Sequence, residues 1–247
     1  MKISKQEIKR VSRNDPGFPY LLKETPSTPA ELYVMGKLFD EAPADRPKIA
    51  VVGTRKATSS GKALAKNVAK TLAEQGVVIV SGLAMGIDTA AHEGAVLAGA
   101  RTIAVLANGL DSIYPVQNEN LAKKILELDG AIVSEYPMGT PSFPNQFLER
   151  NRIISGLSIA TVIIEAPERS GSLATANWAV EQGREVFVFP GPVNHPNYRG
   201  SHKLIRDGAR LVTSVEDILE DLNISINQFN QHKSASVKIK DKNQLLI

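Results

Sequence analysis

Residues 49–61 read IAVVGTRKATSSG, an apolar run followed at once by glycine, two cations and four hydroxyl side chains. A continuous apolar run rich in β-branched residues is typical of a strand that is buried on both faces. The run therefore predicts an interior strand. The amphipathic stretch near 60–75 predicts a helix that crosses over to the next parallel strand.

This pairing of an apolar run with an amphipathic stretch recurs along the chain. Further strands are expected at 77–82, 102–107, 131–134, 160–165, 185–190 and 209–213. Helices are expected near 87–98, 118–128, 149–156, 172–182 and 215–222. The pattern predicts the α/β class, as an extended, doubly wound Rossmann-like fold whose mostly parallel sheet carries helices on both faces.

Three segments are expected from the composition along the chain. Residues 1–48 hold six prolines between positions 11 and 48, which predicts an irregular, partly extended lead-in that packs on the core through its apolar side chains. Residues 49–222 form the Rossmann-like domain. Residues 223–247 are polar and basic, and we expect a disordered tail without a winged-helix domain.

The composition excludes several classes of protein. The 247 residues are 43% hydrophobic, which is ordinary for a globular chain. The absence of cysteine excludes a disulfide scaffold, a thiol nucleophile, a cysteine-ligated zinc and an iron–sulfur cluster. No apolar leader or run of eighteen uncharged apolar residues occurs, so we expect a cytoplasmic protein without a membrane span.

The charge is distributed unevenly. The formal net charge is +3 and the pI is about 9.0. Residues 1–48 and 223–247 carry the excess of lysine and arginine, whereas 49–222 holds 16 basic and 18 acidic side chains. A polyanion would therefore be bound by a local cluster of cations and not by the field of the whole domain.

The first candidate site follows the strand at 49–53, where Gly53, Thr54 and Arg55 stand before a helix. Ligands of open α/β sheets bind at the carboxyl ends of strands, and a helix N-terminus with hydroxyl groups suits a phosphate. The dinucleotide and P-loop patterns both fail, because Arg55 and Lys56 occupy positions that those patterns reserve for glycine. The alternative is a capped turn with a solvated pair of cations.

Two more strand ends carry similar chemistry. Gly82 and Gly86 stand four apart before a helix, and hydroxyl groups cluster after the strand at 160–165. The candidates in that second cluster are Ser170, Gly171, Ser172 and Thr175. Each turn alone is explained by ordinary turn chemistry, but three such turns at one edge of a sheet predict a crevice for an anionic ligand.

The stretch 147–158 brings a charged cluster to the start of a helix. Arg150 and Arg152 lie on different faces of that helix, with Asn151 between them. We expect one arginine to bind a phosphate and the other to pair with a carboxylate such as Glu149 or Glu165. The alternative is a pair of structural arginines. Lys203 is a further candidate phosphate ligand with weaker support.

No catalytic set assembles from the sequence. The four histidines are scattered, no second histidine completes a zinc-protease helix, and no Gly-x-Ser-x-Gly elbow occurs. We therefore expect a protein that is not an enzyme and that needs neither a metal nor a cofactor.

Six ordered motifs resemble the DNA-processing protein A family, also called DprA or Smf. They are Gly53-Thr54-Arg55, residues 81–88, residues 108–115, residues 147–158, residues 165–176, and Pro190-Gly191 with residues 204–209. The resemblance implies a Rossmann fold that binds single-stranded DNA, forms a homodimer, and helps load the RecA recombinase on incoming DNA during natural transformation and recombination. It also implies that the DNA-binding pocket lies at Gly53–Arg55, Arg150–Arg152 and Ser170–Ser172.

One departure from the family pattern and two rival functions stay open. Glu149 stands where many relatives place a basic residue, which weakens the expected phosphate affinity. One rival is a nucleotide hydrolase of the lysine-decarboxylase-like Rossmann group, although Trp178 stands where that group places a glutamate. The other rival is a sensor of small nucleotides that uses the same crevice.

Overall fold

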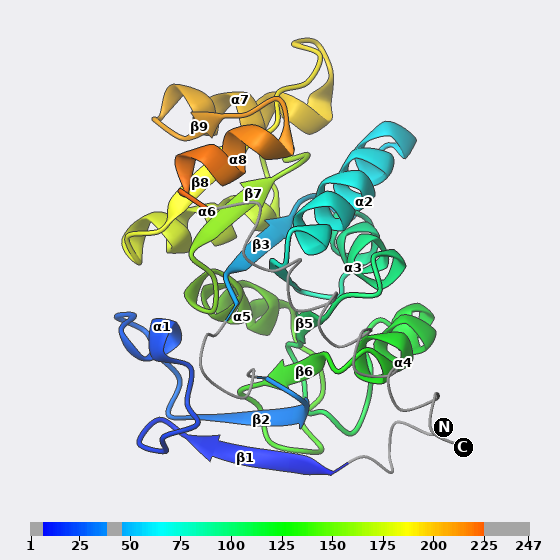
Figure 1. Cartoon of the computed structure of the whole chain (residues 1–247), viewed down its shortest axis with the longest axis vertical. Coiled ribbons are helices and arrows are strands. Elements are labelled where there is room, and N and C mark those ends of the chain that lie inside the picture. The colour runs from blue at the N-terminus through cyan, green and yellow to red at the C-terminus, as the bar shows by residue number, and fades with distance from the viewer. Residues whose placement is uncertain (1–6, 39–45, 225–247) are drawn as a thin grey trace, which may run out of the picture.

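A nine-stranded sheet runs through the part of the chain that the computed structural model describes, residues 7–38 and 46–224 (Figure 1). The strand order is β1-β2-β6-β5-β4-β3-β7-β8-β9. The strands are β1 (Ile8–Ser12), β2 (Glu31–Gly36), β3 (Lys48–Val52), β4 (Val78–Ser81), β5 (Thr102–Val105), β6 (Ala131–Ser134), β7 (Ala160–Ile163), β8 (Glu185–Val188) and β9 (Arg210–Leu211). The last seven strands in this order, from β6 through β3 to β9, pair in parallel. Strand β2 pairs antiparallel with both β1 and β6.

The direction in which strands are added reverses beside β3. The chain places β4, β5 and β6 in succession on one side of β3, and then β7, β8 and β9 on the other side. The loops that follow β3 and β7 therefore leave the sheet toward opposite faces and open a crevice between them. This reversal is the feature of the fold that positions the site described below.

Helices cover both faces of the sheet, which confirms the predicted doubly wound architecture. The α-helices are α1 (Tyr20–Lys23), α2 (Ser59–Glu74), α3 (Ile87–Leu97), α4 (Glu119–Glu127), α5 (Pro144–Gly156), α6 (Gly171–Glu181), α7 (Arg199–Arg206) and α8 (Val215–Asp221). Two short 3₁₀ turns, η2 (Val116–Asn118) and η3 (Pro196–Tyr198), precede α4 and α7. One face carries α2, α3, α4 and α8, and the other carries α1, α5, α6 and α7.

The interior strands are buried on both faces, as their unbroken apolar runs predict. In β3, Ile49 and Val51 pack with the α2 and α3 layer, while Ala50 and Val52 pack with the α5 and α6 layer. Successive side chains of a strand point to opposite faces, so a strand between two helical layers has no face left for polar residues.

The lead-in differs from the irregular segment expected from its prolines. Its segments Ile8–Ser12 and Glu31–Gly36 pair with each other as a hairpin, and β2 pairs further with β6. The prolines of residues 7–38 stand between or beside these strands, at positions 16, 19, 26 and 29. The prediction averaged the proline content over residues 11–48, so it missed two short strands, β1 and β2, that contain no proline. The expected tail lies almost wholly outside the described residues.

Helix α5 begins at Pro144, five residues before the expected position 149. Proline fits the first turn of a helix, and the backbone N–H of Phe143 donates to Oε1 of Gln146 at 2.6 Å. The first turns of α5 are rich in polar residues and lack the amphipathic pattern of its later part, so the predicted start came too late. Within the described ranges, every helix is too short or too polar to cross a lipid bilayer.

The close approach of α2 and α3 depends on Gly94. A Cβ atom at Gly94 would lie 2.2 Å from the carbonyl oxygen of Lys66 and 3.0 Å from Cβ of Ala69. We expect Gly94→Ala to lower the free energy of unfolding by about 1–3 kcal/mol, because two packed backbones must separate. In an uncrowded helix interior the same substitution has the opposite effect, because replacing glycine by alanine there raises the free energy of unfolding by about 1 kcal/mol.

Denaturant unfolding measures this difference. Gly17→Ala is the matched control, because a Cβ at Gly17 meets nothing within 4 Å. A Gly94→Ala protein as stable as the wild type would show that the two helices have room to separate at no cost.

Candidate functional site

The loops that follow β3, β4 and β7 converge on one cavity at the reversal point of the sheet. The cavity has a volume of about 560 Å³, which is within the usual range for ligand sites. Nine of the predicted site residues line it: Gly53, Thr54, Arg55, Arg150, Asn151, Ser170, Gly171, Ser172 and Thr175. We refer to this cavity as the crevice.

Close backbone contacts hold the loop after β3 in place. A Cβ at Gly53 would lie 2.6 Å from Cγ1 of Ile87, and the backbone N–H of Thr54 donates to the carbonyl of Glu165 at 2.8 Å. Gly86 has a φ of +88°, and a Cβ there would lie 2.4 Å from the carbonyl oxygen of Thr54. Gly86 therefore lies behind the loop and supports it, without lining the crevice itself.

Arg55 is exposed, and its guanidinium lies at the crevice with donors available to a ligand. Its Cζ atom lies 4.5 Å from the centre of the Phe147 ring, a distance typical of a cation–π contact. Within the described parts of the chain, the Arg55 side chain makes no hydrogen bond or ion pair, and the charge of the buried Asp88 carboxylate acts on it without a direct bond. The aromatic contact orients the guanidinium and leaves its N–H groups unused.

Arg150 is only 2% exposed and bonds to the sheet itself. Its Nη1 donates to the carbonyl of Gly82 at 2.8 Å and also to the carbonyl of Val105. Its Nε donates to Oδ1 of Asn151 at 3.3 Å. Arg150 therefore joins the ends of β4 and β5 beneath the crevice, which is the structural role considered as the alternative above.

Asp88 compensates the charge of this buried cation. A Cβ at Gly82 would lie 2.6 Å from Nη2 of Arg150 and 2.7 Å from Oδ2 of Asp88, so glycine leaves room for both groups. Burial lowers the pKa of Arg150 to about 10, and the Asp88 carboxylate opposes that shift. Burial raises the pKa of Asp88, against the opposing effect of Arg150. Gly82 lines a second, smaller cavity that adjoins the crevice.

The N-terminus of α6 forms the opposite wall of the crevice. Ser170 caps the helix by accepting from the backbone N–H of Ser172 at 3.3 Å, and the two hydroxyl groups are 2.7 Å apart. Asn151 fixes this turn, because its Nδ2 donates to the carbonyl of Gly171 at 3.0 Å. The positive end of the helix dipole and the hydroxyl groups make this wall suitable for an anion.

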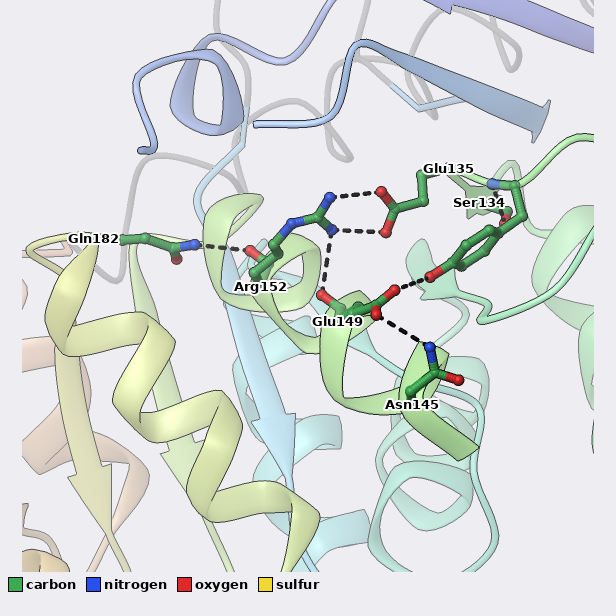
Figure 2. A network of polar contacts seen from close by, with 7 residues as sticks. Ser134, Glu135, Asn145, Glu149, Arg152 and Gln182 are labelled. Carbon is green, nitrogen blue, oxygen red and sulfur yellow. Dashed lines mark hydrogen bonds and ion pairs between the residues drawn. The ribbon is translucent and has the colours of Figure 1, made fainter. Parts of the chain in front are cut away.

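Arg152 does not line the crevice, and its guanidinium is engaged by Glu135 (Figure 2). Its Nη1 and Nη2 bond to the two oxygens of Glu135 at 2.7 and 2.5 Å, and both side chains are 15% exposed. The expectation that an arginine here pairs with a carboxylate is therefore met, but with Glu135 and not with Glu149 or Glu165. Glu149 instead accepts from the Tyr136 hydroxyl at 2.9 Å.

Lys203 also lies outside the crevice. It is an exposed residue on α7 and does not contribute to the lining. The sequence suggested it because it follows a turn-rich loop, but that loop packs beside the far end of the β3–α2 connection. Asn197 of this loop bonds to the carbonyl of Lys56 at 3.0 Å.

Several lining residues were not among the predicted site residues. They are mainly Tyr114, Ser142, Phe147, Leu148, Arg169 and Asp88. A signal for Phe147 was present, because positions 147, 150, 151 and 154 share one face of a helix and all line the crevice. Tyr114 belongs to the motif at residues 108–115, but that motif did not show that the side chain reaches the crevice from a loop after β5.

Glu165 ties the β3–α2 loop to the 3₁₀ turn η3 from within the protein. Its carboxylate accepts two hydrogen bonds from Thr58, one from the backbone N–H at 3.0 Å and one from the hydroxyl at 2.5 Å. It accepts a third from the Tyr198 hydroxyl at 3.0 Å. Asn197 donates a further bond at 3.1 Å. Burial raises the pKa of Glu165, but the hydrogen bonds from Thr58, Asn197 and Tyr198 outweigh it, so the pKa lies below its ordinary value.

No group of three histidine, aspartate or glutamate side chains within residues 7–38 and 46–224 is arranged to hold a metal ion. His92 is completely buried in the middle of α3 with Nδ1 2.8 Å from the Thr102 hydroxyl, and burial lowers its pKa to about 3. The crevice thus offers an open guanidinium, a helix N-terminus and hydroxyl groups, which together can bind an anion.

Comparison with known proteins gives a consistent result. The profile of the family described as DNA recombination-mediator protein A matches residues 9–223. The protein Smf of Escherichia coli K12 is 45% identical over 210 residues, which are 85% of this chain and 55% of that protein. The chain therefore spans about half the length of this relative.

Two solved structures are similar over most of the chain. The X-ray structure of DNA processing protein A from Streptococcus pneumoniae has a TM-score of 0.79 and 40% identity, covering 87% of this chain and 74% of that one. The Helicobacter pylori protein, whose structure was described for its single-stranded DNA binding mode, has a TM-score of 0.77 and 29% identity. Its match covers 89% of this chain and 97% of that one.

The Glu165 network predicts a pH-dependent loss of stability on substitution. A lowered pKa in the folded state means that the ionised group stabilises the fold above about pH 4.5, and that this contribution disappears as the pH falls through the folded-state pKa. We expect Glu165→Gln to lower the free energy of unfolding by about 2–3 kcal/mol at pH 7, because charge-assisted hydrogen bonds are lost.

Urea unfolding between pH 7 and pH 3 tests this expectation, with the exposed Glu168→Gln as the control. The deficit of Glu165→Gln should shrink as the solution is acidified. A deficit that stays constant over this range would mean that the charge of Glu165 contributes nothing.

Proposed function

The chain belongs to the DNA recombination-mediator protein A family, and from this membership and the crevice we propose that it binds single-stranded DNA. In this proposal the crevice holds phosphates of one strand, without catalysis. The protein protects incoming DNA in the cytoplasm and helps to load the RecA recombinase during natural transformation and recombination. RecA as a partner and a homodimeric state are proposed from the family resemblance.

One observation carries the proposal. An exposed guanidinium with unused donors, that of Arg55, lines the same crevice as the N-terminus of α6. Arginine binds phosphate through two parallel hydrogen bonds, and a helix N-terminus adds N–H groups and a favourable dipole. An anion in the crevice therefore has a cation on one side and a helix N-terminus on the other.

The three predicted arginines take different parts in this proposal. Arg55 contacts the phosphate directly. Arg150 adds positive charge beneath the crevice but keeps its bonds to the carbonyls of Gly82 and Val105. Arg152 stays with Glu135, so we do not assign it to the DNA. Arg169 is exposed at the rim and is the next candidate contact.

The shape of the site favours a single strand over a duplex. The crevice opens between the β3–α2 loop and α6, and exposed apolar side chains of Tyr114 and Leu148 line it beside the cations. A single strand presents both phosphates and unpaired bases to such a site, whereas the bases of a duplex are paired and stacked inside it. The Helicobacter pylori relative, described as binding single-stranded DNA, supports this choice.

Affinity should depend on Arg55 and on salt. Neutralising a phosphate releases condensed counterions, so log K for a single strand falls by about 0.7 per contact for each tenfold rise in salt. We expect Arg55→Ala to weaken binding of a labelled thymidine oligonucleotide about tenfold and to reduce the salt slope by about one contact.

Fluorescence anisotropy over a salt series measures both quantities. Arg206→Ala is the matched control, because it removes the same charge from an exposed position on α7 outside the crevice. An Arg55→Ala protein that binds like the wild type would overturn the assignment of the crevice. A second measurement separates the rival functions, since release of free base from a nucleoside monophosphate would show hydrolysis.

A further inference from the structure

We propose that Asn197 is a positioning residue for Arg55: its side-chain amide holds the backbone of the β3–α2 loop and thereby sets the place of the Arg55 guanidinium in the crevice. This inference rests on the proposed function, because Arg55 is the phosphate contact that Asn197 positions. It gives a role to the turn-rich segment 190–198, none of whose residues lines the crevice.

The side-chain amide of Asn197 joins two segments that are far apart in the sequence. Its Nδ2 donates to the carbonyl of Lys56 at 3.0 Å and to Oε2 of Glu165 at 3.1 Å. An amide nitrogen carries two hydrogens, which is enough to serve both acceptors. Lys56 follows Arg55 directly, so this bond fixes the backbone one residue beyond the arginine.

Other contacts anchor the loop on both sides of this bond. The backbone N–H of Thr54 donates to the carbonyl of Glu165 at 2.8 Å, and the carbonyl of Thr54 accepts from the N–H of Ile87 at 3.3 Å. Further along the loop, Thr58 donates two hydrogen bonds to the Glu165 carboxylate and caps α2. The bond from Asn197 holds the stretch between these two anchors, which is the stretch that carries Arg55.

Asn197 is itself held firmly in η3. Its backbone N–H donates to Nδ1 of His195 at 3.2 Å, which caps the turn. The next residue, Tyr198, is buried, and its hydroxyl donates to Glu165 at 3.0 Å. A Cβ at Gly191 would lie 2.2 Å from Cδ1 of Tyr198, so the segment folds closely over that ring. A donor on such a support can keep a loop in one conformation.

Arg55 depends on its backbone for its position in the crevice. Within residues 7–38 and 46–224, its side chain contacts the Phe147 ring but makes no hydrogen bond. An arginine that samples several positions must be ordered when a phosphate binds, and this ordering lowers the affinity. Removing the amide of Asn197 should therefore weaken DNA binding, although Asn197 lies outside the crevice.

Two variants remove the contact. Asn197→Ala deletes the amide, and Asn197→Asp keeps its shape but places a carboxylate, which cannot donate, beside Glu165. We expect each variant to weaken binding of a labelled thymidine oligonucleotide to the full chain by about fivefold or more, measured by fluorescence anisotropy. Asn194→Ala is the matched control, because Asn194 is exposed in the same segment, and this variant should bind like the wild type.

A double-mutant cycle with Arg55 separates positioning from a general loss of structure. If Asn197 acts through Arg55, Asn197→Ala lowers the affinity of the wild type and leaves the affinity of Arg55→Ala unchanged. If Asn197→Ala weakens binding by the same factor in both backgrounds, Asn197 acts independently of Arg55 and the inference is overturned. Thermal unfolding checks that every variant is folded at the assay temperature.

Hydrogen–deuterium exchange measures the loop itself, without any ligand. The backbone amides of residues 55–57 should exchange faster in Asn197→Ala than in the wild type, whereas Asn194→Ala should leave their exchange unchanged. Unchanged exchange in Asn197→Ala would mean that the loop needs no support from η3, and it would refute the inference.

The outcomes keep this inference apart from the proposed function. If Arg55→Ala weakens binding and neither variant of Asn197 does, the crevice binds DNA and the role of Asn197 is refuted. If the wild type does not bind the oligonucleotide, the proposed function fails, and the inference that rests on it fails as well.

Discussion

The buried guanidinium of Arg150 is the interaction on which the site depends. It donates to carbonyls at the ends of β4 and β5 and lies beside Asp88, with Gly82 leaving space for both charges. A buried cation is tolerated only where such partners compensate its loss of water. Because Arg150 fixes α5 against the carboxyl edge of the sheet, Phe147 and Asn151 on the same helix are placed in the crevice.

Three arginines near this edge of the sheet lie in different surroundings. Arg150 is buried and bonded to main-chain carbonyls, Arg152 is held by Glu135, and Arg55 lies over an aromatic ring with its donors open. Three arginines that look alike in the sequence thus have three different environments. The net charge of the domain is a poor guide to anion binding, because the position of one open cation matters more than the sum.

Much of the fold and part of the site were predictable from the sequence. Unbroken β-branched runs predicted the parallel strands, and the rule that ligands bind at strand carboxyl ends brought three separate loops to one crevice. The side on which Arg152 points was not predictable, because Glu135 follows a different strand and only tertiary packing brings them together. Composition does not show that Tyr114 and Phe147 meet at the crevice, because that contact also depends on tertiary packing.

The central claim is that the crevice at the reversal point of the sheet receives a single strand of DNA. A crystal structure of this chain with a short thymidine oligonucleotide tests it most directly. We expect a phosphate within hydrogen-bonding distance of the Arg55 guanidinium and beside the N-terminus of α6. A strand bound across another surface, such as the exposed cations of α7, with the crevice left empty, would contradict the claim.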